Sequence, residues 1–97
     1  MPGMRKAPTP YAHSLFAKFL HRRLEQLKHS RTEQEIADEA LLHDVKYLRM
    51  LRRGEEQLPF DYIPWLARAI RVDPLHIFRL VVDQHWPGLE QTFLVLV

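Results

Sequence analysis

The chain has 97 residues, of which 46% are hydrophobic, and its net charge is +2. This length predicts one domain, and the absence of cysteine excludes disulfides, thiolate metal sites and cysteine nucleophiles. Because no apolar run could span a bilayer and the first ten residues lack the apolar core of a signal peptide, we expect a cytoplasmic protein without a membrane partner.

The first predicted helix follows a flexible N-terminal tail over residues 1–8, which contains two prolines and one glycine. Thr9 and Pro10 suit the cap and the first position of this helix, which should end near residues 28–30. The apolar side chains of its buried face recur every three or four residues: Phe16, Leu20, Leu24 and Leu27.

Two short helices joined by a tight turn are predicted over residues 32–53. Thr32 and Glu35 have the three-residue spacing of a capping box, so the first of these helices starts there and continues to residue 40 or 41. Residues 41–43 form the turn that leads into the second.

The second of these helices, over residues 45–53, has opposite apolar and basic faces. Asp44 caps its start, and Gly54 supplies the left-handed residue with which helices commonly end. Leu48 and Leu51 point inward. The charged side chains are expected to point outward: Lys46, Arg49, Arg52 and Arg53. For Arg52, the alternative is an ion pair with the first helix or with the acidic residues after Gly54.

Two further helices complete the predicted bundle. One runs from about residue 59 to 71 and the other from the Asp73 cap to about residue 85, where Trp86, Pro87 and Gly88 break it. We expect Trp65 in the core, whereas Trp86 is equally suited to the core and to a partner contact. The buried stripe of the fourth helix is: Ile63, Leu66, Ala67 and Ile70.

Positive charge is concentrated in the half of the chain that contains the two short helices. Residues 1–54 hold 11 Lys and Arg against 6 Asp and Glu, whereas residues 55–97 hold 3 against 6. A polyanion partner for the basic half is therefore one interpretation, and a chance asymmetry is the other.

Three segments carry a family resemblance: IADEA at 36–40, YLRMLRRG at 47–54 and LARAIRVDP at 66–74. Over residues 14–85 the chain resembles the Cro/repressor-type, or xenobiotic-response-element-type, helix-turn-helix family, and its second half is similar to a bacterial subgroup of small regulators. The resemblance implies an all-α fold. The expected domain is a compact five-helix, lambda-repressor-like helix-turn-helix bundle over residues 9–86 with a short apolar extension over residues 87–97.

The same resemblance implies a function. It predicts a sequence-specific DNA-binding transcriptional regulator, by default a repressor, that acts as a homodimer on double-stranded DNA and inserts the helix at 45–53 into the major groove. It places Val45, Lys46 and Met50 at base edges, where a lysine can donate to guanine and apolar groups can cover a thymine methyl. The residues expected at phosphates are: Thr32, Gln34, Tyr47, Arg49, Arg53 and Gln57.

Three positions depart from the family pattern. Leu41 stands in the turn where glycine is common, and His43 lengthens that turn by one residue. Glu33 replaces a glutamine that bonds a phosphate, which is unfavourable because a carboxylate repels phosphate, although Gln34 could serve instead. Glu33 and the other acidic residues of the first short helix favour the alternative function, a protein-interaction module of the same fold, such as an anti-activator or antitoxin-like partner, with weak or no DNA binding.

The C-terminal segment FLVLV at 93–97 is apolar and is compatible with either a helix or a strand. Left in water it would favour aggregation, so it should fold back on its own helices or bury against a second copy. We favour a dimer contact made by the following residues: Trp86, Leu89, Phe93, Leu94 and Leu96.

No catalytic constellation is evident in the sequence. None of the six histidines has a metal-ligand spacing, and there is no glycine-rich phosphate loop. We therefore expect no metal, no cofactor, no small-molecule substrate and no enzymatic activity.

Overall fold

The computed structural model describes residues 8–89, and within them the chain forms five α-helices, one 3-10 turn and no strand. The all-α fold expected from the sequence is confirmed. The predicted N-terminal tail up to residue 7 and the extension from residue 90 onward lie outside the described residues. The elements in chain order are α1 (Leu15–Leu27), α2 (Glu33–Glu39), α3 (Val45–Arg53), η1 (Phe60–Tyr62), α4 (Ile63–Ala69) and α5 (Pro74–His85).

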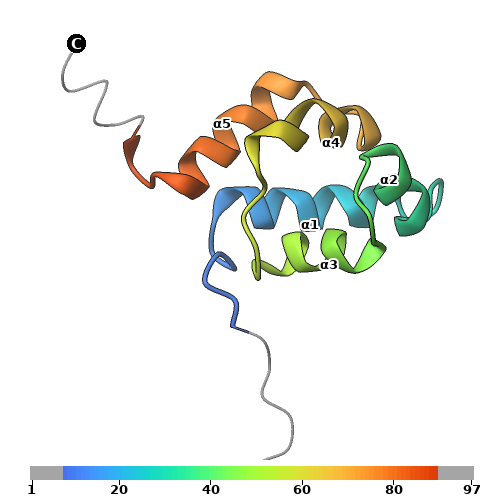
Figure 1. Cartoon of the computed structure of the whole chain (residues 1–97), viewed down its shortest axis with the longest axis horizontal. Coiled ribbons are helices and arrows are strands. Elements are labelled where there is room, and N and C mark those ends of the chain that lie inside the picture. Colours follow the sequence, from blue (N-terminus) through green and yellow to red (C-terminus); the bar gives the residue numbers. More distant parts are fainter. Residues whose placement is uncertain (1–7, 90–97) are drawn as a thin grey trace, which may run out of the picture.

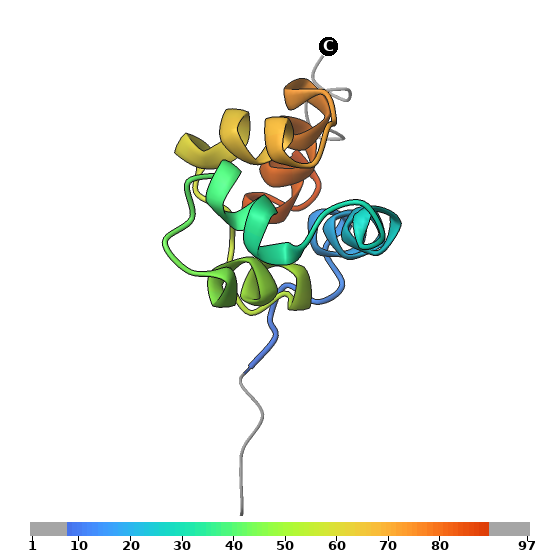
Figure 2. The same ribbon diagram turned by 90° about the vertical axis from the view of Figure 1, so that its right-hand side faces the viewer.

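The helices surround one core, with α1 as its central element (Figure 1). Helix α3 packs on one side of α1 and α5 packs on another, while α2 contacts both α3 and α4. Figure 2 shows α1 nearly end-on, with α3 at the bottom of the bundle and α4 and α5 at the top. No helix within the described residues is both long and apolar enough to cross a membrane.

The core contains apolar side chains from all five helices, most of them fully buried. Burying one such side chain stabilises the folded state by about 1.5–3 kcal/mol. Trp65 is an exception to the expected core, because 41% of its surface is exposed, so its predicted burial was wrong. The largest fully buried side chains are Phe16, Leu20, Ile36, Leu48, Leu51, Leu58, Leu66, Ile70, Ile77 and Val81.

Helix α1 starts five residues later than the sequence predicted. Ser14 is its cap, and the Ser14 hydroxyl accepts the Ala17 N–H at 3.1 Å. The predicted start at Thr9 and Pro10 was wrong because this segment is a turn, in which the Tyr11 N–H donates to the Gly54 carbonyl at 2.9 Å. A tertiary hydrogen bond thus takes the place of a first helical turn.

The connection between α2 and α3 is a tight turn with one left-handed residue. Leu41 has a φ of 61° and a side chain that is 53% exposed, whereas Leu42 beside it is buried. The Leu42 N–H donates to the Ala37 carbonyl at 2.9 Å, which closes the end of α2. A left-handed leucine costs about 1–2 kcal/mol, which the burial of Leu42 offsets.

The last two helices begin near the predicted positions. The fourth predicted helix is divided into the 3-10 turn η1 and α4, and it ends at Ala69 because Arg71 is left-handed, with a φ of 60°. Arg23 of α1 stabilises this end, since its Nε donates to the Ile70 carbonyl at 2.8 Å. Asp73 caps α5 by accepting the Leu75 N–H at 2.9 Å.

Candidate nucleic-acid interface

Helix α3 presents a basic face to solvent and an apolar face to the core. The Asp44 carboxylate accepts the Lys46 N–H at 2.9 Å and so fixes the start of the helix. Leu48 and Leu51 are fully buried against the core, as predicted. Gly54 ends the helix with a φ of 80°, in the left-handed conformation that the sequence predicted.

The outward arc of α3 brings together all three residues predicted to contact bases and two of those predicted to contact phosphates. At 100° per residue, the five positions on this arc cover about 140° of the helix surface. Lys46, Arg49 and Arg53 are exposed, and Val45 and Met50 are half-buried at the two edges of the arc. This set, which we call the α3 face, combines three cations with two apolar side chains.

Lys46 is the member of the α3 face with the fewest constraints. Its side chain is exposed, and its ammonium group makes no ion pair or hydrogen bond within residues 8–89. A lysine in this state is available to an outside acceptor, such as a base edge or a phosphate oxygen.

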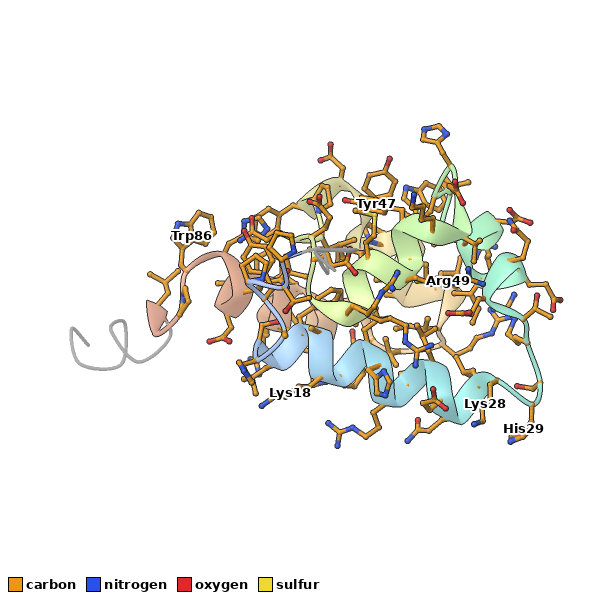
Figure 3. All side chains as sticks on the ribbon, turned by 90° about the horizontal axis from the view of Figure 1, so that it is seen from below. Lys18, Lys28, His29, Tyr47, Arg49 and Trp86 are labelled. Carbon is orange, nitrogen blue, oxygen red and sulfur yellow. The ribbon has the colours of Figure 1, made fainter. Side chains whose placement is uncertain are left out.

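Arg49 is paired with the start of α2. Its Nε lies 3.2 Å from Oε1 of Glu33, and 51% of the Arg49 side chain remains exposed. Figure 3 shows Arg49 and Tyr47 as side chains of α3, on the side of the molecule seen from below. The pairing means that the Glu33 carboxylate, which the sequence placed against phosphate, is next to a guanidinium.

Arg52 does not point outward, so its predicted orientation was wrong. Only 14% of its side chain is exposed, and its guanidinium lies 2.8 Å from Glu25 of α1 and 3.3 Å from Glu33 of α2. His21 of α1 adds a ring nitrogen at 2.9 Å. The alternative of pairing with the first helix is therefore the one observed, and Arg52 joins three helices.

The charge of Glu25 reflects this arrangement. Lys28, which lies 3.0 Å away, and Arg52 together lower the pKa of Glu25 from 4.5 to about 2. The carboxylate therefore stays ionised well below neutral pH and keeps its attraction for Arg52.

Arg53 lies at the end of the α3 face with 57% of its side chain exposed. Its Nε donates to the Arg49 carbonyl at 3.2 Å and pairs with Glu55 at 3.0 Å. Tyr47 lies on another side of α3, about 120° around the helix from Arg53, and its hydroxyl lies 3.4 Å from the Gln57 carbonyl. Burial raises the pKa of Tyr47, as does the nearby negative charge of Glu56.

A surface cleft adjoins the start of α3. It has a volume of about 430 Å³, and Tyr47 of α3 forms one of its walls. Most of its lining side chains are apolar or aromatic, with Asp44 and His43 at the turn. The lining residues are Leu42, His43, Asp44, Tyr47, Pro59 and Tyr62.

The start of α2 carries the remaining predicted phosphate contacts. The Thr32 hydroxyl accepts the Glu35 N–H at 3.1 Å, and the Glu35 carboxylate accepts the Thr32 N–H at 2.9 Å, which confirms the predicted capping box. These bonds lower the pKa of Glu35. Gln34 is exposed and donates to Asp38 at 2.9 Å, so its amide is already engaged within α2.

Most acidic groups of α2 are paired with cations or bonded within the fold. Glu39 lies 3.2 Å from Arg71 and forms a closer pair with Arg31, and the bond from Arg31 lowers the pKa of Glu39. Together with the Glu33 pairs, these contacts neutralise two of the carboxylates that the sequence placed near the candidate interface.

A second surface feature is an aromatic cluster between η1 and α5, made by Phe60, Phe78, His85 and Trp86. The Phe60 ring stacks on Trp86 with centroids 5.9 Å apart and lies 6.0 Å from Phe78. Trp86 is 54% exposed and Phe78 is 46% exposed. The sequence singled out only Trp86, because Phe60 and Phe78 are 18 residues apart and nothing local predicts their contact.

The other residues of the predicted dimer contact are only partly observed. Leu89 is half-buried, and Phe93, Leu94 and Leu96 lie outside the described residues. Within residues 8–89, no group of three or more His, Cys, Asp or Glu side chains could hold a metal ion.

Comparisons of the chain with protein-family models, with curated proteins and with solved structures give no match.

Proposed function

We propose that this protein is a sequence-specific DNA-binding transcriptional regulator that inserts α3 into the major groove. The observation that carries the proposal is the α3 face, in which three cations lie between two apolar side chains on a short, well-capped helix. An α-helix fits the major groove, and positive charge along its exposed side matches the phosphates on both edges of that groove.

The members of the α3 face divide into two roles. Lys46 is unpaired within the described residues and stands near the start of α3, so it is suited to donate to guanine O6 or N7. Val45 and Met50 are suited to thymine methyl groups. Arg49 and Arg53, together with Thr32, Gln34, Tyr47 and Gln57, fix the register through phosphates and carry no sequence information.

The proposed regulator acts as a homodimer in the cytoplasm, and repression is its expected effect. One α3 reads few base pairs, so a two-fold dimer that reads half-sites about 34 Å apart gains affinity and specificity. The exposed aromatic cluster supports a protein contact at α5, and we assign the dimer contact to Trp86 and the chain that follows it.

A protein-interaction module with weak or no DNA binding is the second candidate. The observation in its favour is the exposed aromatic cluster, because exposed Trp and Phe side chains are typical of protein interfaces. Against it stand the ion pairs of Glu33 and Glu39, which reduce the negative charge beside α3.

Selection of duplexes from a random DNA pool by the full-length protein separates the two candidates. The DNA-binding proposal predicts enrichment of a motif with two related half-sites. The matched control is the Lys46→Ala variant, for which one position within each half-site should lose its preference. Enrichment of no motif by the unaltered protein contradicts sequence-specific binding and favours the interaction module.

A further inference from the structure

Glu33 occupies a position between two arginines of α3. One carboxylate oxygen lies 3.2 Å from Nε of Arg49, and the other lies 3.3 Å from a terminal nitrogen of Arg52. The Glu33 side chain is 32% exposed, so this bridge lies at the edge of the protein surface where α2 meets α3.

The bridge engages Arg49 through one nitrogen only. Within residues 8–89 the two terminal nitrogens of Arg49 donate no hydrogen bond, and half of the side chain is exposed. A guanidinium held at Nε keeps its terminal N–H groups available for bidentate contact with a phosphate. Holding the side chain in one orientation also reduces the entropy lost when that contact forms.

The Glu33 carboxylate is itself held in place by Arg52. Arg52 is 14% exposed, and it is bound at the same time by Glu25 and His21 of α1. The side chain of Arg52 therefore has little freedom, and through Glu33 the position of Arg49 is tied to α1 as well as to α2.

We propose that Glu33 is a positioning residue of the DNA-contacting surface, which orients the Arg49 guanidinium toward a phosphate of the duplex. The proposal rests on the proposed function, and it gives Glu33 an effect on DNA binding opposite to the one that its charge alone predicts. A carboxylate near phosphate opposes binding by charge alone, whereas a carboxylate that holds an arginine in the productive orientation favours it.

These two effects predict opposite results when Glu33 is replaced. Removing the charge by Glu33→Ala should tighten DNA binding if repulsion dominates and weaken it if positioning dominates. Glu33→Asp keeps the charge but withdraws the carboxylate by one methylene group, so it should weaken binding only if positioning matters. The two variants together separate charge from geometry.

The experiment measures duplex dissociation constants for full-length Glu33→Ala, Glu33→Asp, Arg49→Met and the double variant Glu33→Ala/Arg49→Met, at several salt concentrations. The probe is the duplex selected from the random pool. We expect each Glu33 variant to bind about fivefold more weakly, the size of one charged contact at a wet surface. Arg49→Met should lower the salt slope by about 0.9 for each phosphate that the variant no longer neutralises.

The double variant supplies the decisive comparison. In the Arg49→Met background there is no guanidinium to orient, so Glu33→Ala should leave binding unchanged or tighten it. If Glu33→Ala weakened binding through loss of the Arg52 pair, the weakening would persist in the Arg49→Met background. If it weakened binding by unfolding the protein, the Tm would fall. Neither explanation gives weakening that depends on Arg49.

Three outcomes overturn the proposal. Tighter binding by Glu33→Ala in the unaltered background shows that repulsion dominates. Equal weakening by Glu33→Ala with and without Arg49 shows a role that does not pass through Arg49. Absence of DNA binding by the unaltered protein removes the proposed function itself, and that result is distinguishable because it appears before any variant is compared.

Discussion

The Tyr11 N–H donates to the Gly54 carbonyl at 2.9 Å, which brings the segment before α1 against the end of α3. The approach is so close that a Cβ added at Gly54 would lie 2.3 Å from the Ala12 nitrogen. Glycine is therefore required at this position for two reasons, its left-handed conformation and the absence of space. The end of the candidate recognition helix is fixed by a contact that no local pattern encodes.

Gly54→Ala is expected to destabilise the fold by more than its backbone conformation alone explains. A left-handed alanine costs about 1–3 kcal/mol, and the clash with backbone atoms of Ala12 adds to that cost. Gly88→Ala is the matched control, because Gly88 has a φ of 82° but a Cβ added there would meet no atom within 4 Å. Urea denaturation should show the larger loss for Gly54→Ala. Equal losses would mean that the close approach does not matter.

Acid is expected to weaken the contact between α1 and α3 through Glu25. The Glu25 pKa is 4.5 in the unfolded chain and about 2 in the folded protein, so the unfolded state binds more protons between these values. The stabilisation is fully present above pH 4.5 and is lost as the pH falls toward 2. Thermal unfolding of the unaltered protein and of Glu25→Gln should therefore converge over this range. A Tm difference that stays constant from about pH 6 to pH 2 would contradict the assignment.

Lys46 and Arg53 are expected to contribute differently to DNA binding. Lys46→Ala should relax the preference at one base position and cost about 1–3 kcal/mol on the selected duplex, because the proposed contact of Lys46 is to a base. Arg53→Ala should weaken selected and random duplexes about equally, because the proposed contact of Arg53 is to a phosphate. Titration of both variants on both duplexes tests the division. Equal losses for Lys46→Ala on the two duplexes would remove it from the base-contact set.

The aromatic cluster is expected to form part of the dimer contact. Trp86→Ala removes a side chain that is 54% exposed, so the fold should persist while the dimer dissociates. Trp65→Ala is the matched control, since it removes an exposed tryptophan outside the cluster. Truncation after Gly88 should likewise give a folded monomer that binds the selected duplex much more weakly. Sedimentation equilibrium measures the assembly state, and a dimer that survives both changes would place the interface elsewhere.

The features predicted correctly from the sequence are those that depend on neighbours along the chain. The capping box at Thr32, the Asp44 and Asp73 caps and the left-handed Gly54 each involve residues within one helical turn. The buried stripe of the α3 helix follows from its helical period in the same way. These local signals are sufficient to place the members of the α3 face on one side of a single helix.

The features that the sequence did not predict depend on residues distant in the chain. Arg52 turns inward because Glu25, 27 residues away, binds it from α1. Glu33 pairs with Arg49 across 16 residues because the left-handed Leu41 folds α3 back onto α2. Charge patterns alone therefore placed the arginines on the correct helix, but they could not show which carboxylates neutralise them.

The salt dependence of duplex binding by the full-length protein is the most direct test of the central claim. Each phosphate neutralised by a cation contributes a slope of about −0.9 to a plot of log affinity against log salt concentration. Because two protomers would each present Arg49 and Arg53, DNA recognition by the α3 face predicts a slope steeper than about −3 on the selected duplex. A slope near zero, or no binding to any duplex at low salt, would contradict the proposal that the α3 face recognises DNA.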